Sequence, residues 1–211
     1  MAPVRSRPAG ALEFFLPGSW AHIDVTQPLD KSRLRREVEK LTGSRDDLSK
    51  ERARMVEMLE SVLADPPASL ESLLICAEIE PGTPLPILLA VHGTDALYMS
   101  PAIGTDPDAV LAVFKQGREQ LYGESAEESA EVVTRTGKAL RTSQVTDMRL
   151  HPSNDEVTVP ALVATYWVTI PDSKHLMAAT FYTPMVDIAH LAMRYFDAIV
   201  GASRYVGASE A

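Results

Sequence analysis

The sequence predicts an α+β domain in which helices cover an antiparallel β-sheet. Apolar residues recur with the period of an α-helix in four segments, whereas the middle and the C-terminal half carry runs of strand-forming residues. Short turns separate these runs, and a parallel return needs a crossover of about a dozen residues, so consecutive strands are expected to be antiparallel. Neither an internal repeat nor a long Gly/Ser linker divides the 211 residues, which predicts one domain over 14–205 between tails at 1–13 and 206–211.

The N-terminal part is predicted to contain one strand followed by two helices. Trp20–Val25 alternates apolar with smaller or polar residues, as a strand does. An apolar stripe over 34–41 predicts the first helix, which Gly43 ends. A second stripe over 48–62 predicts the next helix, and Asp65-Pro66-Pro67 stops it.

A strand pair and a short helix are predicted next. Leu70–Ile79 and Leu85–Val91 are apolar runs, and the Pro81-Gly82 turn between them favours an antiparallel hairpin. In Asp106-Pro107-Asp108, the proline suits the first helical position and the carboxylates suit the positive end of the helix dipole. This helix is expected to extend to about Leu121.

Strands dominate the C-terminal half. Four are predicted, over Val132–Thr136, Ala139–Leu150, Val157–Ile170 and His175–Tyr182. Gly137-Lys138 and 171–174 supply turns between them. The nearly uninterrupted apolar run at 159–170 indicates a central strand that is covered on both faces. Thr183-Pro184 is expected to start a last helix that Gly201 ends, and 202–211 to be mostly tail.

Charge and hydropathy exclude two classes of partner. The chain has 20 Lys and Arg against 29 Asp and Glu, a net charge of −9, and no basic stripe reverses this balance locally. Such a chain repels phosphate backbones, so nucleic acid is not expected as a partner. The apolar run Ala11–Leu16 contains Glu13 and makes a poor signal peptide, and no apolar stretch is long enough to span a membrane. We expect a cytoplasmic protein without membrane insertion.

The common catalytic and cofactor motifs are absent from the sequence. It contains no phosphate-binding loop, dinucleotide fingerprint, nucleophile elbow, zinc-protease motif or EF-hand loop. The single cysteine, Cys76, lies in an apolar run and is interpreted as a small buried hydrophobe. One cysteine forms no internal disulfide and excludes multi-cysteine zinc sites. We therefore expect no cofactor, no metal and no enzymatic activity.

An enzyme or a small-ligand protein is an alternative, with a site assembled from distant residues. The five histidines are isolated in the sequence. His92 follows a strand and precedes Gly93, which makes it the best candidate for an acid or base at a strand end. Asp95 would orient His92, and His175 would complete the site. This alternative requires the three side chains to lie within hydrogen-bond reach in one concave pocket.

Two segments are candidates for partner binding. The first is the most acidic run of the chain, residues 124–131, called the acidic run below. It either docks a basic partner or is a solvated connection. The second is the loop 96–103, whose apolar residues either pack back over the core or line a groove for a peptide or helix. The candidate binding residues are Glu124, Glu127, Glu128, Glu131, Tyr98 and Met99.

Both ends of the chain resemble a known fold family. Pro17–Asp24 has the pattern Pro-Gly-x-Trp-x-x-Ile-Asp. Near the end, Val163–Pro171 and Leu176–Pro184 form a strand pair that leads into a helix with Phe196–Val200. These features, which together span Phe14–Tyr205, are similar to those of the Mog1/PsbP-like fold and of uncharacterised bacterial proteins of that shape. The resemblance implies an antiparallel sheet sandwiched between helices.

The resemblance also implies a binding role. Related domains include a Ran-binding nucleotide-release factor, photosystem assembly and oxygen-evolving subunits, and chaperones that shelter hydrophobic segments of secreted effectors. We therefore expect a non-catalytic, cytoplasmic protein-binding module, an adaptor or chaperone-like protein, whose partner is another protein. The alternatives are a structural subunit of a larger assembly or a homodimer, indicated by a self-complementary edge strand, and an enzyme with a site near His92.

Overall fold

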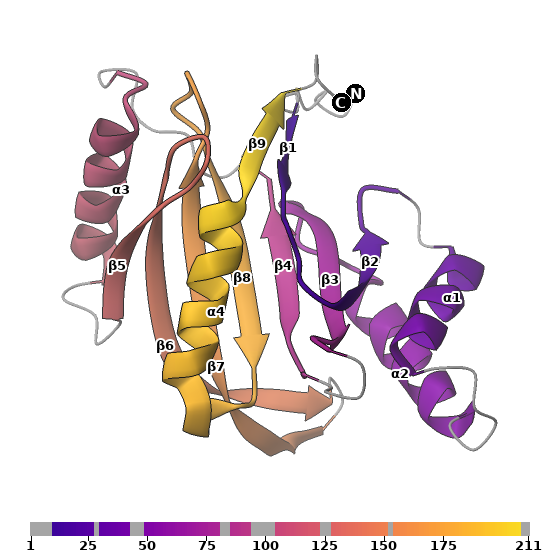
Figure 1. Cartoon of the computed structure of the whole chain (residues 1–211). Helices are drawn as coiled ribbons and strands as arrows, with labels where there is room; N and C mark the ends of the chain where they lie inside the picture. The colour runs from indigo at the N-terminus through magenta and orange to yellow at the C-terminus, as the bar shows by residue number, and fades with distance from the viewer. Residues whose placement is uncertain are drawn as a thin grey trace.

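The helices and strands of the protein lie as shown in Figure 1, a computed structural model that describes residues 10–27, 30–42, 49–80, 85–93, 104–122, 128–151 and 154–207. The helices are α1 (Lys31–Thr42), α2 (Ser49–Val62), α3 (Pro107–Tyr122) and α4 (Ala189–Ala202), with the 3-10 turn η3 (Val186–Ile188) before α4. The strands are β1 (Gly10–Glu13), β2 (Ser19–Asp24), β3 (Leu70–Glu78), β4 (Leu88–His92), β5 (Glu128–Val133), β6 (Lys138–His151), β7 (Asn154–Thr169), β8 (Leu176–Thr183) and β9 (Arg204–Gly207).

Seven of these strands form one sheet in the order β2-β3-β4-β8-β7-β6-β5, in which every neighbouring pair is antiparallel. The predicted α+β class and the antiparallel sheet are therefore confirmed. β1 and β9 form a separate antiparallel ribbon, which brings the two ends of the described chain together (Figure 1). The order leaves β2 and β5 as the two edges of the large sheet.

The central position of β7 and β8 follows from how the chain returns. β5, β6, β7 and β8 pair in succession, each with the next, and β8 then pairs with β4. The segment that contains α3 therefore carries the chain from β4 to the far edge of the sheet, where β5 begins the return. This arrangement places the apolar run that we predicted as a central strand inside the sheet, as β7.

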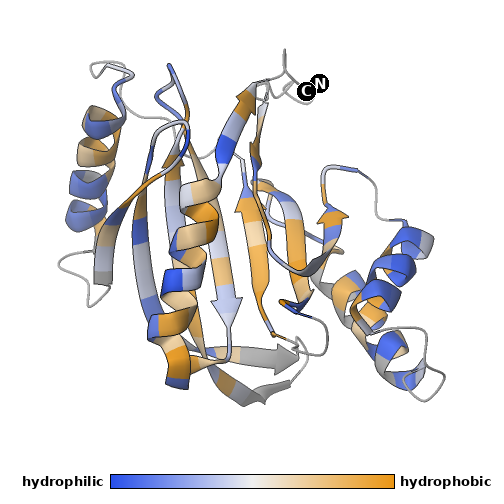
Figure 2. Cartoon of the chain, in the orientation of Figure 1, coloured by the Kyte–Doolittle hydropathy of each residue, from blue (hydrophilic) through white to orange (hydrophobic). Residues whose placement is uncertain are grey.

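α4 covers one face of the sheet. Tyr166 and Phe181, on β7 and β8, belong to the large hydrophobic cluster that α4 completes with Phe196 and Val200. The rings of Phe181 and Phe196 stack with their centroids 4.4 Å apart. In Figure 2, apolar segments recur along α4 between hydrophilic ones. Because aromatic pairs add to simple area burial, this contact fixes the position of the helix over the strands.

The other three helices cover the opposite face. Successive residues of a strand point to opposite faces, so Trp167 lies on the other side of β7 from Tyr166. Trp167 packs against α3, where the centroid of its ring is 4.9 Å from that of Phe114. On β4, Leu89 belongs to the cluster under α4, whereas Ala90 belongs to the cluster formed with α1 and α2. The clusters of α1, α2 and α3 therefore share one side of the sheet.

A buried polar network fastens α4 to the sheet. Nη1 of Arg141, on β6, lies 2.5 Å from the Asp197 carboxylate on α4, and the Tyr166 hydroxyl donates to the same carboxylate at 2.8 Å. Burial, together with the hydrogen bond to Asp197, raises the pKa of Tyr166. Two donors thus satisfy both carboxylate oxygens, which is what makes a partly buried charge tolerable.

Both terminal segments that we predicted as tails contain a short strand. Residues 10–13 form β1 and residues 204–207 form β9, and the two strands pair from Gly10 with Gly207 to Glu13 with Arg204. The Glu13 carboxylate lies 2.5 Å from Arg204 Nε. Short strands such as these have no periodicity that a sequence reading can detect, because their pairing partner lies at the other end of the chain.

Two further boundaries differ from the prediction. The last helix does not begin at Thr183-Pro184, because Thr183 ends β8 and its hydroxyl accepts a hydrogen bond from the Met185 amide at 3.3 Å. η3 follows, and α4 begins at Ala189. β5 begins at Glu128 instead of Val132, so part of the acidic run is a strand and not a connection. Pairing with β6 outweighs the poor strand propensity of glutamate at an edge.

The buried network predicts a contribution of Tyr166 to alkaline stability. Its pKa is raised above 10, so above pH 10 the unfolded chain loses a proton that the folded chain keeps, and stability falls by about 1.4 kcal/mol per pH unit until the folded pKa is reached. Tyr166→Phe should be less stable than the wild type at pH 8, by about 1 kcal/mol for the lost hydrogen bond, but lose less between pH 9 and 11. Denaturant unfolding at pH 8, 9 and 11 gives the free energy of unfolding of both proteins. An equal loss of stability between pH 9 and 11 in the wild type and in Tyr166→Phe would contradict the prediction.

Candidate functional site

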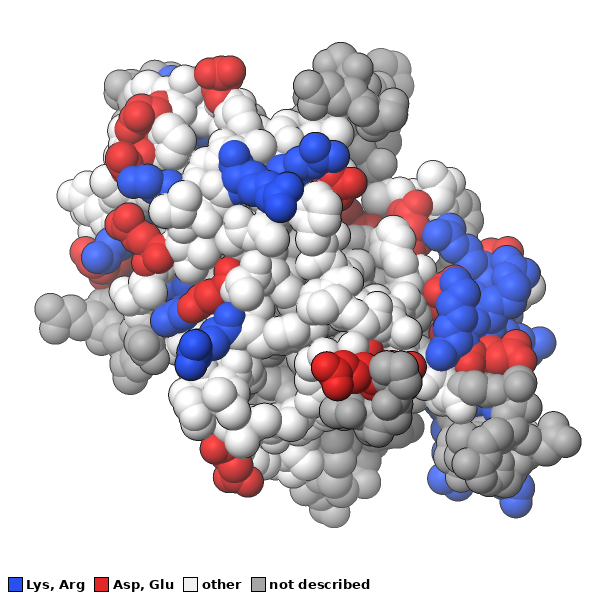
Figure 3. Space-filling view, viewed as in Figure 1, with Lys and Arg blue, Asp and Glu red and all other residues white. Residues whose placement is uncertain are grey.

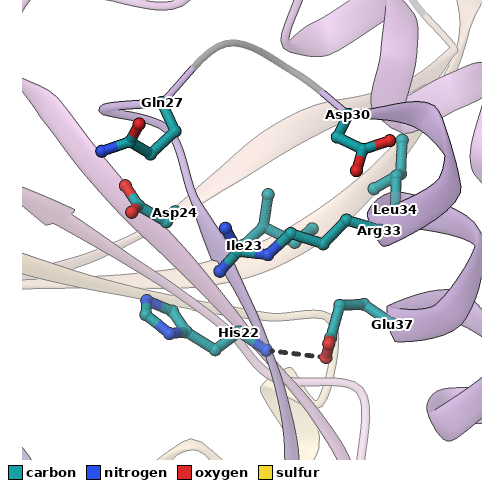
Figure 4. Close-up of a pocket in the computed structure, with 8 residues that line it drawn as sticks. All are labelled: His22, Ile23, Asp24, Gln27, Asp30, Arg33, Leu34 and Glu37. Carbon is teal, nitrogen blue, oxygen red and sulfur yellow. Dashed lines mark hydrogen bonds between the residues drawn. The ribbon is translucent and has the colours of Figure 1, made fainter.

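A polar pocket of about 260 Å³ lies between the edge strand β2 and helix α1 (Figure 4). β2 and the connection after it supply one wall, and α1 supplies the other. Arg33 extends from α1 across the pocket toward Asp24 and His22 on β2 (Figure 4). The lining residues are His22, Ile23, Asp24, Gln27, Asp30, Arg33, Leu34 and Glu37.

One contact in this pocket closes an edge of the sheet. The Val25 amide donates to the Glu71 carbonyl, and hydrogen-bonded pairs alternate along an antiparallel ladder, so the His22 N–H points away from β3. The Glu37 carboxylate accepts from this N–H at 3.4 Å (Figure 4). It also accepts from Lys40 at 2.7 Å. α1 therefore occupies the position that a further strand would need beside β2.

The acidic groups of the pocket are held in their charged form by local hydrogen bonds. For Asp24, burial favours the neutral acid, but the hydroxyl and amide of Thr26, with Arg33 nearby, outweigh it and lower the pKa. For Asp30, hydrogen bonds from the Ser32 hydroxyl and amide lower the pKa. Asp30 directly precedes α1, so its carboxylate caps the helix.

The composition of the pocket favours a structural role. Asp24, Asp30 and Glu37 face one guanidinium, that of Arg33, so the carboxylates of the lining outnumber its guanidinium by two. Each carboxylate already accepts a hydrogen bond from the chain itself. Within the described ranges, no three His, Cys, Asp or Glu side chains come together as metal ligands. The pocket is best explained as the contact that fastens α1 to β2.

The described residues place two members of the site predicted around His92. His92 ends β4 and pairs with Ala178, three residues after His175, so both histidines lie at the same end of the sheet. His92 Nδ1 is 3.1 Å from Ser69 Oγ, and burial lowers the pKa of His92, which favours its neutral form. No described acidic side chain is hydrogen-bonded to His92, and Asp95 lies outside the described residues. A nucleophile and base would need such an orienting group.

Cys76 is the small buried hydrophobe that the sequence predicts. Its side chain is buried in the cluster under α4, and burial, aided by the charge of Glu78, raises its pKa to about 11. A thiol that is both inaccessible and protonated at neutral pH is a poor nucleophile.

The acidic run leads to the second edge of the sheet. Glu128 and Glu131 lie on β5, the terminal strand beside β6. The other predicted binding residues, Glu124, Glu127, Tyr98 and Met99, lie outside the described residues. The sequence therefore identified one segment of this edge, although it did not show that the segment is a strand.

Part of the backbone of β5 points outward at this edge and has no hydrogen-bond partner among the described residues. The Thr134 amide donates to the Gly137 carbonyl at 3.0 Å, so the two residues form a hydrogen-bonded pair. By alternation, the N–H and C=O groups of Ser129, Glu131 and Val133 then point away from β6. No group in the described part of the chain bonds to those of Ser129 and Glu131.

The end of β5 near Val133 is partly covered. A Cβ added at Gly201 of α4 would lie 3.4 Å from the Val133 carbonyl oxygen, and the Arg135 amide donates to the Ser203 carbonyl at 3.1 Å. The C-terminus of α4 therefore approaches this end of the strand. The open stretch of the edge is the part around Ser129 and Glu131.

Among the described residues, carboxylates outnumber cations beside this open stretch. The hydrogen bond between Lys138 and Asp108 raises the pKa of Lys138, and the charges of Glu131 and Asp106 add to this effect. Three carboxylates therefore lie near the Lys138 ammonium group, and Arg118, whose Nη1 donates to the Thr142 hydroxyl opposite Ser129, is a second cation on this side of the sheet. At the other end of the molecule, Lys and Arg gather over α1 and α2 (Figure 3). α1 alone carries five basic against two acidic residues.

No family model matches the chain, and neither a curated protein nor a solved structure shows significant similarity to it. The Mog1/PsbP-like resemblance therefore stays a prediction. Among the described helices, none is long and apolar enough to cross a membrane.

The sequence did not predict which strands form the two edges of the sheet, nor what lies beside each edge. Asp30-x-Ser32 before an apolar stripe is a readable signal for a helix start, and so predicts one wall of the pocket. The contact of Glu37 with His22 has no such signal, because it depends on which strand becomes the edge. For the same reason, the sequence did not predict that the backbone of Glu131 points outward at an edge.

Removal of Glu37 should open the β2 edge. In Glu37→Ala, the His22 amide loses its acceptor and is left to solvent, so we expect its hydrogen exchange to accelerate several-fold while amides of β7 are unchanged. Glu39→Ala, an exposed substitution on the same helix, is the matched control. Exchange measured by NMR tests this, and identical rates at His22 in both variants would show that Glu37 does not protect the edge.

The burial of Cys76 predicts a native state that resists alkylation. With a pKa near 11 and no access for the reagent, the native thiol should react with iodoacetamide far more slowly at pH 8 than the same chain in urea. Intact-mass spectrometry follows the reaction. Stoichiometric labelling of the native protein at the rate of the urea-unfolded chain would disprove this interpretation of Cys76.

Proposed function

We propose that the protein is a non-catalytic protein-binding module that takes up an extended segment of its partner along β5. The observation that carries this proposal is the outward-pointing backbone of Ser129 and Glu131 at an edge of the sheet, which bonds to no described group. A strand added there would continue the antiparallel ladder, with main-chain hydrogen bonds that each contribute about 1 kcal/mol.

The difference between the two edges supports this choice. β2 is blocked by α1 and by the Glu37 carboxylate, so a partner strand has no access there. β5 has no such cover among the described residues at Ser129 and Glu131. Exposed edges invite pairing with other chains, so an edge that stays open while the opposite edge is protected favours a binding role.

The remaining expectations belong to the same proposal. An adaptor or chaperone-like protein in the cytoplasm agrees with a net charge of −9, which disfavours nucleic acid as the partner. Helices on both faces of the sheet are also what a Mog1/PsbP-like sandwich requires, and we propose that fold on this basis.

Proline substitutions on β5 test the proposal. The N–H groups of Ser129 and Glu131 point outward, so Ser129→Pro and Glu131→Pro block the edge and keep the hydrogen bonds to β6. Circular dichroism and thermal unfolding establish that each variant folds. Proteins cross-linked to the tagged chain in lysate of its source are then quantified by mass spectrometry, with Glu131→Gln as the matched control.

We expect a partner whose recovery falls at least ten-fold with both proline variants and far less with Glu131→Gln. Recovery that survives both substitutions overturns the proposal. So does a lysate in which no captured protein depends on β5. A chain that captures only its own copies, with loss in the proline variants, would replace the proposal by the homodimer alternative.

A further inference from the structure

We infer that the segment bound along β5 is basic on one face and apolar on the other, with the two kinds of residue alternating. This inference rests on the proposed function, because it assigns the chemistry of the partner to the same edge. The two faces of β5 differ in what they offer, and a strand added beside it must match each face separately.

Glu131 defines the basic face of the partner. Its side chain is exposed and lies on the same side of the sheet as Lys138, which pairs with Asp108. A residue directly opposite Glu131 on an added strand would project to this same side. A second cation, Arg118, lies on this side too, since its Nη1 donates to the Thr142 hydroxyl opposite Ser129. Among the described groups, the carboxylates of Asp106, Asp108 and Glu131 still outnumber these two cations, so the local excess is negative. A lysine or arginine fits there, whereas an acidic residue is repelled.

Val132 defines the apolar face of the partner. It pairs with Ala139 and packs against the cluster that α4 covers, so it lies on the opposite side of β5 from Glu131. Val132 is only half-buried, and Ala130, on the same side, is half-buried as well. An apolar residue of the added strand would extend this covered surface. The positions next to the basic residue should therefore be apolar.

A second copy of the chain is a poorer occupant of this edge. In an antiparallel β5–β5 pair centred on residue 130, 131 or 132, the two copies of Glu131 lie opposite each other or on the diagonal, about 7–8 Å apart. Like charges directly opposite each other destabilise a sheet, and long side chains on the diagonal are still within reach of each other. The charge of the edge therefore selects a different chain, and a basic one.

Labelled peptides test the pattern directly. Three short capped peptides are compared by fluorescence anisotropy: one alternates lysine and valine, one alternates glutamate and valine, and one has the lysines and valines in separate blocks. We expect the Lys-Val alternation to bind the wild-type chain about ten-fold more tightly than the Glu-Val alternation, since attraction is replaced by repulsion. The block peptide should also bind more weakly, because it cannot match both faces.

Charge reversal on the protein supplies the decisive comparison. Glu131→Lys should reverse the preference between the two alternating peptides. Asp187→Lys, an exposed change on η3 with the same effect on net charge, should leave the preference unchanged. A preference for Lys-Val that persists in Glu131→Lys overturns the inference, because the attraction then comes from the net charge of the whole chain.

The edge variant separates the two levels of the argument. Glu131→Pro should weaken both alternating peptides, since it blocks the edge whatever the charge. Equal affinity for both peptides with loss in Glu131→Pro refutes the basic partner but keeps strand addition along β5. Binding that Glu131→Pro leaves unchanged, or no detectable binding of the Lys-Val peptide, refutes the inference, and unchanged binding counts against strand addition as well.

Discussion

Burial of β7 and β8 on both faces is the constraint on which the rest of the arrangement depends. Each residue pair of these strands faces either α4 or the opposite group of helices, so neighbouring side chains must satisfy two different environments. Tyr166 shows the consequence, since its ring is fully buried and its hydroxyl still reaches Asp197. Helices can be added only where the strands leave apolar surface, and the polar contacts among them then fix their positions.

Local patterns were sufficient to predict the central part of this arrangement. The apolar run in β7, the helical stripes of α1 and α2, and the Asp106 cap of α3 all occur where the sequence places them. What local pattern does not specify is which strand meets which. The pairing of β4 with β8 joins residues about 90 positions apart, so neither segment contains a local pattern that predicts it. The identity of the two edges of the sheet follows from this pairing.

Only part of the candidate site could therefore be predicted from the sequence. The acidic run was visible as composition, but the strand character of Glu128–Glu131 depends on β6 as its neighbour. At the other edge, the carboxylate of Glu37 reaches the backbone of His22 only because α1 folds over β2. The sheet thus has one edge closed by a helix and one that, around Ser129 and Glu131, only charge protects among the described residues. Charge is the more selective guard, because it excludes some chains and admits others.

The β1–β9 ribbon gives the chain a particular response to mechanical load. Gly10 pairs with Gly207, so the two ends of the described chain leave the ribbon from the same end. A force that pulls these ends apart opens the ribbon one hydrogen bond at a time, from Gly10 toward Glu13, and does not shear it. The ribbon therefore yields at low tension and lengthens the chain before the seven-stranded sheet carries any load.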